Sequence, residues 1–112
     1  MDRATRSLDG ASGALLRQFF AYDLSFRGGV WLATGQTNGE LTPDIITGAG
    51  EGGGPHVKVF DGASGALDRS FLAYDISFRG GVTVAGGDVT GDGFDDVVTG
   101  TGPGGGPHVK AF

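Results

Sequence analysis

Short apolar segments recur along the chain and are separated by clusters of glycine, proline and aspartate. The segments are rich in Val, Ile, Phe and Tyr, which favour strands, and several are apolar on both faces, as in sheets buried between neighbours. No stretch keeps a 3.6-residue apolar period over enough length to predict a helix. We therefore predict an all-β fold with strands at 15–22, 29–36, 44–48, 55–60, 67–74, 81–88, 95–100 and 107–112.

The segments belong to an internal repeat. Residues 9–60 align without a gap on residues 61–112, and 33 of the 52 paired positions are identical. Each repeat supplies four strands, and we group 15–22 with the first copy and 67–74 with the second, as the outermost strand of each. A four-stranded unit of roughly 50 residues has the size of a β-propeller blade. The repeat predicts a single two-blade propeller unit over residues 1–112.

Two blades cannot close a ring, because propellers typically contain about four to eight blades. We expect closure by oligomerisation, or else a fragment of a longer protein. Counted along the chain, however, the sequence begins with an outermost strand, 15–22, and ends with a third strand at Phe112, which leaves the last blade one strand short. The strand 15–22 of a neighbouring chain would complete it and remove two exposed edges. Three or four chains would then form a ring of six or eight blades. Residues 5–10 are placed like 57–62, as an abbreviated leftover of the preceding strand.

Composition restricts the partners. The 24 glycines follow no three-residue period, and the aromatic and β-branched residues supply enough apolar surface for folding. The net charge of −5 makes nucleic acid an unlikely partner and suits a cation. There is no cysteine, no apolar run of the roughly 20 residues that a bilayer requires, and no signal peptide at the start of this chain. We expect neither nucleic-acid nor membrane binding.

The most acidic stretch is DVTGDGFDD, residues 88–96, between two predicted strands. Calcium takes six to eight oxygen ligands, and this loop offers oxygens at positions 1, 3, 5, 7 and 9. An EF-hand is excluded, because position 12 is Thr99 instead of Glu and no helices flank the loop. The candidate Ca²⁺ ligands are Asp88, Thr90, Asp92, the carbonyl of Phe94, and Asp96.

Together with the following VVTGTGPGGGPHVKAF, this loop resembles the FG-GAP repeat of integrin alpha-subunit propellers and of many bacterial secreted proteins. That family places a D-x-[DNT]-x-D-G-x-x-D calcium loop between the first two strands of each blade. The glycine-rich TGTGPGGGP stands in place of the family's Gly-Ala-Pro motif, so the resemblance supports blade membership more than a subfamily. It implies that the five candidate residues bind Ca²⁺, and that the protein acts outside the cell or on its surface.

The equivalent loop of the first copy, QTNGELTPD at residues 36–44, has lost most of these oxygens. It keeps Asn38, Glu40 and Asp44, has Gln36 at position 1, and carries Leu41 where the second copy has a glycine. We predict calcium binding at 88–96 and a metal-free turn at 36–44. The alternative for both loops is an Asp/Gly turn whose side chains cap backbone amides without a metal.

Other polar residues have simpler interpretations. His56 and His108 follow a proline at a strand start, which favours packing or hydrogen bonding. Asp23 and Asp75 precede Leu-Ser and Ile-Ser and are typical of turns, although a carboxylate pair could also serve a glycosidase. The glycine-rich segments 48–55 and 100–107 are expected to connect hairpins, since they lack the ending of a phosphate loop. Trp31, which could stack on a sugar, is expected to pack between blades.

These observations predict a non-enzymatic, calcium-binding propeller module that acts as a binding or scaffold ring, with a protein or a carbohydrate as its ligand. One alternative is a propeller enzyme, such as a lyase or a glycosidase, since the fold alone does not decide function. The other is an excised or engineered blade pair with no function of its own.

Overall fold

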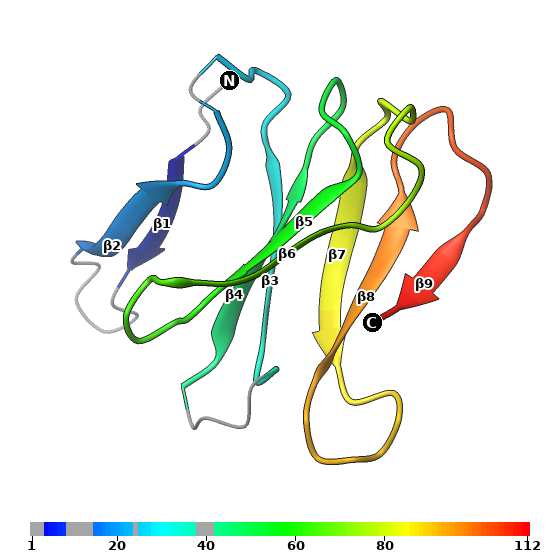
Figure 1. Ribbon diagram of the computed structural model, residues 1–112. Helices are drawn as coiled ribbons and strands as arrows, with labels where there is room; N and C mark the ends of the chain where they lie inside the picture. The colour runs from blue at the N-terminus through cyan, green and yellow to red at the C-terminus, as the bar shows by residue number, and fades with distance from the viewer. Residues whose placement is uncertain (1–3, 9–14, 24, 38–41) are drawn as a thin grey trace.

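The computed structural model describes residues 4–8, 15–23, 25–37 and 42–112, and these form three antiparallel sheets that follow one another in chain order (Figure 1). The described residues contain no helix, which confirms the all-β prediction. The sheets have two, four and three strands, in the orders β1-β2, β3-β4-β5-β6 and β7-β8-β9. The strands are β1 Ala4–Leu8, β2 Leu15–Phe20, β3 Val30–Gly35, β4 Asp44–Ala49, β5 His56–Phe60, β6 Leu67–Leu72, β7 Val82–Gly87, β8 Asp96–Thr101 and β9 Val109–Ala111.

The grouping of the strands by repeat was wrong for one strand of each unit. The fourth strand of the sheet β3-β4-β5 is β6, which begins the second repeat, whereas β2 pairs with β1. The reason is a short connection: the DGASGA segment is a turn that returns the chain beside β5, so that β5 and β6 form a hairpin. The first two sheets therefore span a repeat boundary, and the third sheet has three strands among the described residues, in agreement with the expectation of a last blade that is one strand short.

The β1–β2 hairpin reproduces the β5–β6 hairpin 52 residues earlier. Val57 pairs with Phe71, and Thr5 pairs with Phe19. Both hairpins have a register shift at the same place, between Ser7 and Leu8 and between Val59 and Phe60. The interpretation of residues 5–10 as a leftover of a preceding strand agrees with this register for residues 5–8, and residues 9 and 10 lie outside the described residues.

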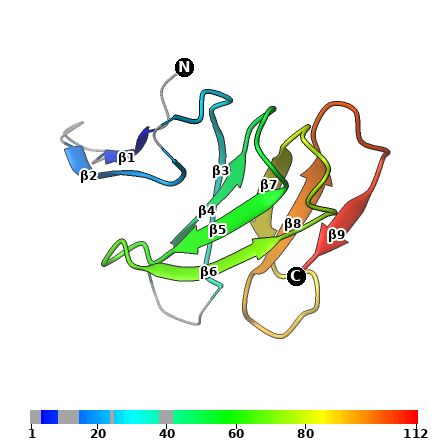
Figure 2. The same ribbon diagram turned by 45° about the horizontal axis from the view of Figure 1, so that its top comes forward.

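The second and third sheets pack face to face, with β7 lying against β3 and β4 (Figure 2). Gly48 allows the close approach, because a Cβ there would collide with the carbonyl oxygen of Val82. Apolar side chains from both sheets form one buried cluster, to which β-branched residues contribute most. Its members are Ile46, Val57, Val59, Ala73, Val82 and Val97.

The far face of the third sheet is not covered by any part of the chain that the structure describes. Val57 of β5 is 0% exposed, whereas its equivalent Val109 in β9 is 69% exposed. The difference arises because the third sheet covers Val57, and no described residue covers Val109. The described sheets do not close into a ring, so the structure supports the all-β class, and the propeller ring stays a proposal.

Strand β9 is shorter than predicted. His56 makes the same backbone contact to Gly54 as His108 makes to Gly106, yet His56 belongs to β5, because it pairs with Leu72 of β6. Strand β9 has no second neighbour among the described residues, so its first residues are left out of the ladder. The ladder nevertheless extends past Ala111, because Phe112 and Val97 exchange backbone hydrogen bonds of 2.7 and 3.0 Å.

Candidate functional site

The acidic loop 88–96 connects β7 to β8 and is folded around the side chain of Asp88. One carboxylate oxygen accepts hydrogen bonds from the backbone N–H groups of Gly91 (2.7 Å) and Asp92 (3.2 Å). The other accepts from Gly93 (2.8 Å). Gly91 and Gly93 both have positive φ, 78° and 90°, which turns their N–H groups inward at little steric cost. The N–H of Gly93, with those of Gly91 and Asp92, lowers the pKa of Asp88 below its ordinary value.

The end of the loop is brought back to its beginning by Asp96. One oxygen of Asp96 accepts hydrogen bonds from the N–H groups of Val89 (3.0 Å) and Thr90 (3.2 Å), and from the hydroxyl of Thr90 (3.2 Å). The same hydroxyl lies 3.5 Å from Asp88. Thr90 therefore stands between the first and last carboxylates of the predicted set, which the fold brings to one side of the loop.

Asp92 and Phe94 lie at the exposed tip. Asp92 accepts a hydrogen bond from the N–H of Phe94 (3.0 Å), and the ring of Phe94 is half exposed. Within the described part of the chain, no three His, Cys, Asp or Glu side chains are grouped as a metal would require. The donor set nevertheless fits a hard cation, because it consists of oxygens alone on a loop that glycines allow to curl. The side chain of Asp92 also interacts with Asp88 and contributes to the lowered pKa of Asp88.

The first loop shares one feature with the second. Asp44 is fully buried and accepts hydrogen bonds from the N–H (3.3 Å) and hydroxyl (2.8 Å) of Thr37, just as Asp96 accepts from Val89 and Thr90. This explains why Asp44 and Asp96 match between the repeats: each closes its loop. The predicted loop residues Asn38, Glu40 and Leu41 lie outside the described residues.

A contact that the sequence did not reveal joins the two loops. Asp95 accepts a hydrogen bond from the backbone N–H of Gln36 (2.8 Å), and its own N–H donates to the carbonyl of Gln36 (2.9 Å). The first loop is thus held by a carboxylate from the next sheet. The only signal was a difference between the repeats, since the equivalent of Asp95 in the first copy is Pro43.

Two tyrosines tie each sheet to the preceding hairpin. Tyr22 follows β2, and its hydroxyl donates to the carbonyl of His56 (2.7 Å) and lies 3.1 Å from the hydroxyl of Thr47. Tyr74 repeats the arrangement after β6, donating to the carbonyl of His108 (2.8 Å) and lying 3.1 Å from the hydroxyl of Thr99. The recurrence of AYD and of the strand threonine in both repeats could have indicated this contact.

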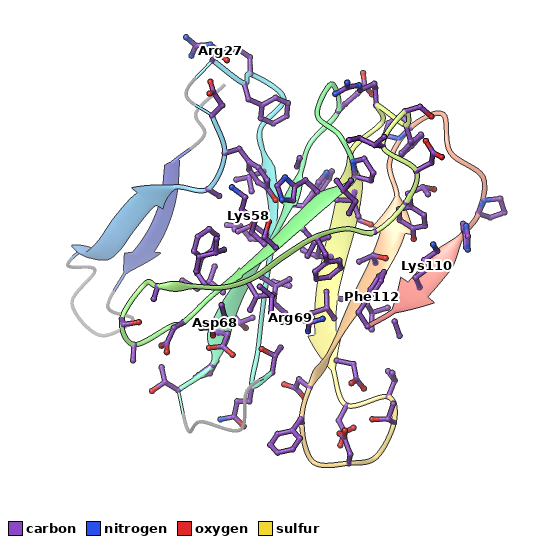
Figure 3. The ribbon with its side chains drawn as sticks, viewed as in Figure 1. Arg27, Lys58, Asp68, Arg69, Lys110 and Phe112 are labelled. Carbon is purple, nitrogen blue, oxygen red and sulfur yellow. The ribbon has the colours of Figure 1, made fainter. Side chains whose placement is uncertain are left out.

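A lysine covers each of these tyrosine rings. The ammonium group of Lys58 lies 5.0 Å from the centroid of the Tyr22 ring, and that of Lys110 lies 5.1 Å from Tyr74. Figure 3 shows the two lysines on successive sheets. Burial raises the pKa of Tyr22 to about 12.

The histidines and the turn aspartates are used in local contacts. His56 shares a 2.6 Å hydrogen bond with the hydroxyl of Ser70, and burial together with the charge of Lys58 lowers its pKa. Asp75 accepts hydrogen bonds from the hydroxyl (2.6 Å) and N–H (2.8 Å) of Ser77, which lower its pKa. Asp23 makes the same two contacts with Ser25. The turn interpretation of both aspartates is confirmed.

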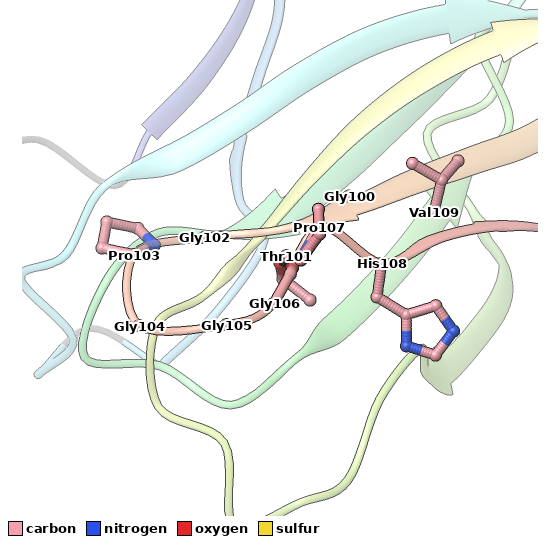
Figure 4. A pocket seen from close by; sticks show the side chains of 10 residues that line it. All are labelled: Gly100, Thr101, Gly102, Pro103, Gly104, Gly105, Gly106, Pro107, His108 and Val109. Atoms are coloured by element: carbon pink, nitrogen blue, oxygen red, sulfur yellow. Dashed lines mark hydrogen bonds between the residues drawn. The ribbon is translucent and has the colours of Figure 1, made fainter.

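A shallow hollow lies inside the glycine-rich connection from β8 to β9 (Figure 4). Glycines and prolines form most of its wall, and the hydroxyl of Thr101 is used internally, in a 2.6 Å hydrogen bond to the carbonyl of Gly106. The segment connects a hairpin, as predicted. The hollow therefore offers little side-chain chemistry beyond His108.

Among the described residues, there is no helix with the length and apolarity needed to cross a membrane. Comparisons of the chain with family models, with curated proteins and with solved structures found no match.

Proposed function

We propose that this chain is a calcium-stabilised pair of propeller blades that associates with further copies into a non-enzymatic ring for binding or scaffolding. Three or four chains would provide six or eight blades. The ring would act outside the cell, where millimolar calcium fills even weak sites. Its ligand would be a protein or a carbohydrate.

The calcium proposal is supported by the Thr90 hydroxyl, which contacts Asp96 and lies beside Asp88. Two carboxylates eight positions apart thereby approach the same hydroxyl, and a hard cation takes oxygen ligands of these kinds. Asp88, Thr90, Asp92 and Asp96 would provide side-chain oxygens, and Phe94 its carbonyl. The ion would supply charge neutralisation and a rigid connection between β7 and β8.

The difference between the loops supports a structural ion at 88–96 alone. Asp95 holds the first loop through the backbone of Gln36. With the 52-residue offset, Gln36 is equivalent to Asp88, and Asp95 is equivalent to Pro43. In an assembly, Asp88 would therefore face Pro43 of a second copy, which offers neither a carboxylate nor an N–H. Calcium would therefore stabilise the second loop, which lacks a contact like that between Asp95 and Gln36.

The assembly proposal is supported by the contrast between buried Val57 and exposed Val109. The exposed face of the third sheet repeats the face of the second sheet that is already covered. A complementary surface exists on the same chain: Val84 of β7 packs against the core, whereas its equivalent Leu32 in β3 is 52% exposed. Sheet β3-β6 of one copy would therefore cover sheet β7-β9 of another.

Enzyme function is less well supported, because the candidate carboxylates are engaged in turns. A general acid in a glycosidase needs a raised pKa. The hydrogen bonds from Ser77 shift the pKa of Asp75 in the opposite direction.

Asp92→Ala tests the calcium site. The variant should lose the rise in melting temperature that calcium gives the parent protein, about 5 °C for each kcal/mol of binding stabilisation in a domain of this size. In EDTA it should melt within a degree or two of the parent, because Asp92 is exposed and its side chain interacts only with its loop neighbours Phe94 and Asp88. The matched control is Asp75→Ala, in which the lost turn should lower melting equally with calcium and with EDTA. An equal loss for Asp92→Ala in both conditions would refute the metal role.

A further inference from the structure

We propose that β1 is a self-cap that occupies the place on β2 which β9 of a second copy takes in the assembly. Formation of the ring would then require β1 to leave β2. This inference rests on the proposed assembly and specifies which strands exchange and what restrains the exchange.

The register in which β1 pairs with β2 is the first observation that supports this inference. Thr5 pairs with Phe19 as Val57 pairs with Phe71, and the register shift recurs at the same place in both hairpins. Because the structural period is 52 residues, β1, β5 and β9 are three versions of one strand. The edge of β2 that β1 occupies is therefore the edge that a strand like β9 would take.

The three strands differ in how well their side chains suit pairing with β2. Strand β5 is HVKVF, and the β9 segment, residues 108–112, is HVKAF, whereas β1 is ATRSL and shares no residue with β5 at an equivalent position. Cross-strand pairs of a β-branched with an aromatic residue stabilise antiparallel sheets. Val109 opposite Phe19 would restore the Val57–Phe71 pair, whereas β1 places Thr5 there, which is β-branched but has a hydroxyl in place of one methyl group of valine.

The second edge of β9, on the side away from β8, indicates which strand would pair with it. Strand β9 pairs with β8 on one side, and no described residue pairs with it on the other. In the preceding sheet, the same edge of β5 is filled by β6, and β2 is the equivalent of β6 in the chain. The exposed face beside this edge includes Val109 and is the repeat equivalent of the face of the second sheet that packs against the third. A second copy supplies both the missing strand, β2, and the covering face around Leu32.

Exchange replaces one set of backbone hydrogen bonds with another. The β1–β2 pairs are lost and β9–β2 pairs are formed, so the net gain comes from better side-chain pairs and from the apolar face that is covered. Such exchanges are close to balanced and depend on concentration. Small changes in β1 should therefore shift the assembly strongly.

Two full-length variants test this in opposite directions. Thr5→Pro removes an N–H from β1 and weakens its pairing with β2, because proline is poorly tolerated within a strand. The double variant Thr5→Val, Ser7→Val makes β1 more like β5 and strengthens the cap. Sedimentation equilibrium in calcium should show association at least tenfold tighter for Thr5→Pro and at least tenfold weaker for the double variant, relative to the parent.

The outcomes separate this inference from the proposed assembly. If the parent associates but Thr5→Pro does not tighten and the double variant does not weaken the association, β1 is no cap and the assembly stands. Val109→Asp in each background should abolish association, which places the contact at β9. If none of the chains associates at any concentration, the proposed assembly fails, and this inference fails with it.

Discussion

At the scale of single residues, the two tyrosines are the most informative pair, because the repeat places them in the same contact at different depths. Both hydroxyls make partly buried contacts with the strand threonines, but the hydrogen bond from Tyr22 to the carbonyl of His56 is also partly buried, whereas that from Tyr74 to the carbonyl of His108 is exposed. Losing a buried partner leaves an acceptor unsatisfied, and losing an exposed one leaves it to water.

Tyr22→Phe should therefore lower the free energy of unfolding by about 1–3 kcal/mol, and Tyr74→Phe by less than about 1 kcal/mol. Urea titrations of the two variants and of the double variant provide the measurement. We expect the two effects to be additive, since the contacts lie in different sheets. A larger loss for Tyr74→Phe would contradict the difference in burial.

Tyr22 also predicts a dependence on alkaline pH. Its pKa in the folded protein is raised to about 12, above its ordinary value of 10.0, because burial disfavours the phenolate. The corresponding stability is fully present below pH 10 and is lost as the pH rises through 12. Stability measured across this range should fall in the parent and fall less in Tyr22→Phe. An identical decline in both proteins would show that another group controls alkaline unfolding.

At the scale of strands and loops, local chemistry was enough to predict the elements. The β-branched runs between glycine and proline turns placed all eight predicted strands, with ends within about two residues of those observed. Strand partners could not be predicted equally well, because pairing depends on how the DGASGA turn directs the chain, and both groupings fit the same pattern. The bond between Asp95 and Gln36 was also beyond sequence reasoning, since it requires the placement of one sheet against the next.

For the acidic loop, too, sequence predicted the residues but not which of two roles they have. Its residues predicted oxygen donors at regular spacing, and the structure does bring Asp88, Thr90 and Asp96 together. The capping of backbone N–H groups, named beforehand as the metal-free alternative, is also present. Sequence alone could not weigh one role against the other, because the same carboxylates serve both.

The interface between the second and third sheets gives a prediction at this scale. Gly48→Ala would place a methyl group against the carbonyl of Val82 and the side chain of Val84, and should cost about 1–3 kcal/mol by overpacking. Gly54→Ala is the matched control, since a Cβ there meets nothing within 4 Å. Thermal melting of both variants decides the matter. Equal melting temperatures would mean that the sheets are less closely packed than described.

At the scale of the whole molecule, no described residue covers one face or one edge of the third sheet, and a matching face and strand lie at the other end of the chain. Open, heterologous contacts of this kind form a ring if the rotation closes, and a filament if it does not. The number of copies therefore depends on the angle between successive sheets, which the described pair already sets.

The most direct test of this account is the solution mass by light scattering over a range of protein concentrations, in calcium, with Val109→Asp as the control. We predict that the mass of the parent rises to a plateau at three or four times the 11.3 kDa of one chain, while Val109→Asp stays at one. A parent that keeps the mass of a single chain at every concentration would contradict the assembly of blades from separate copies.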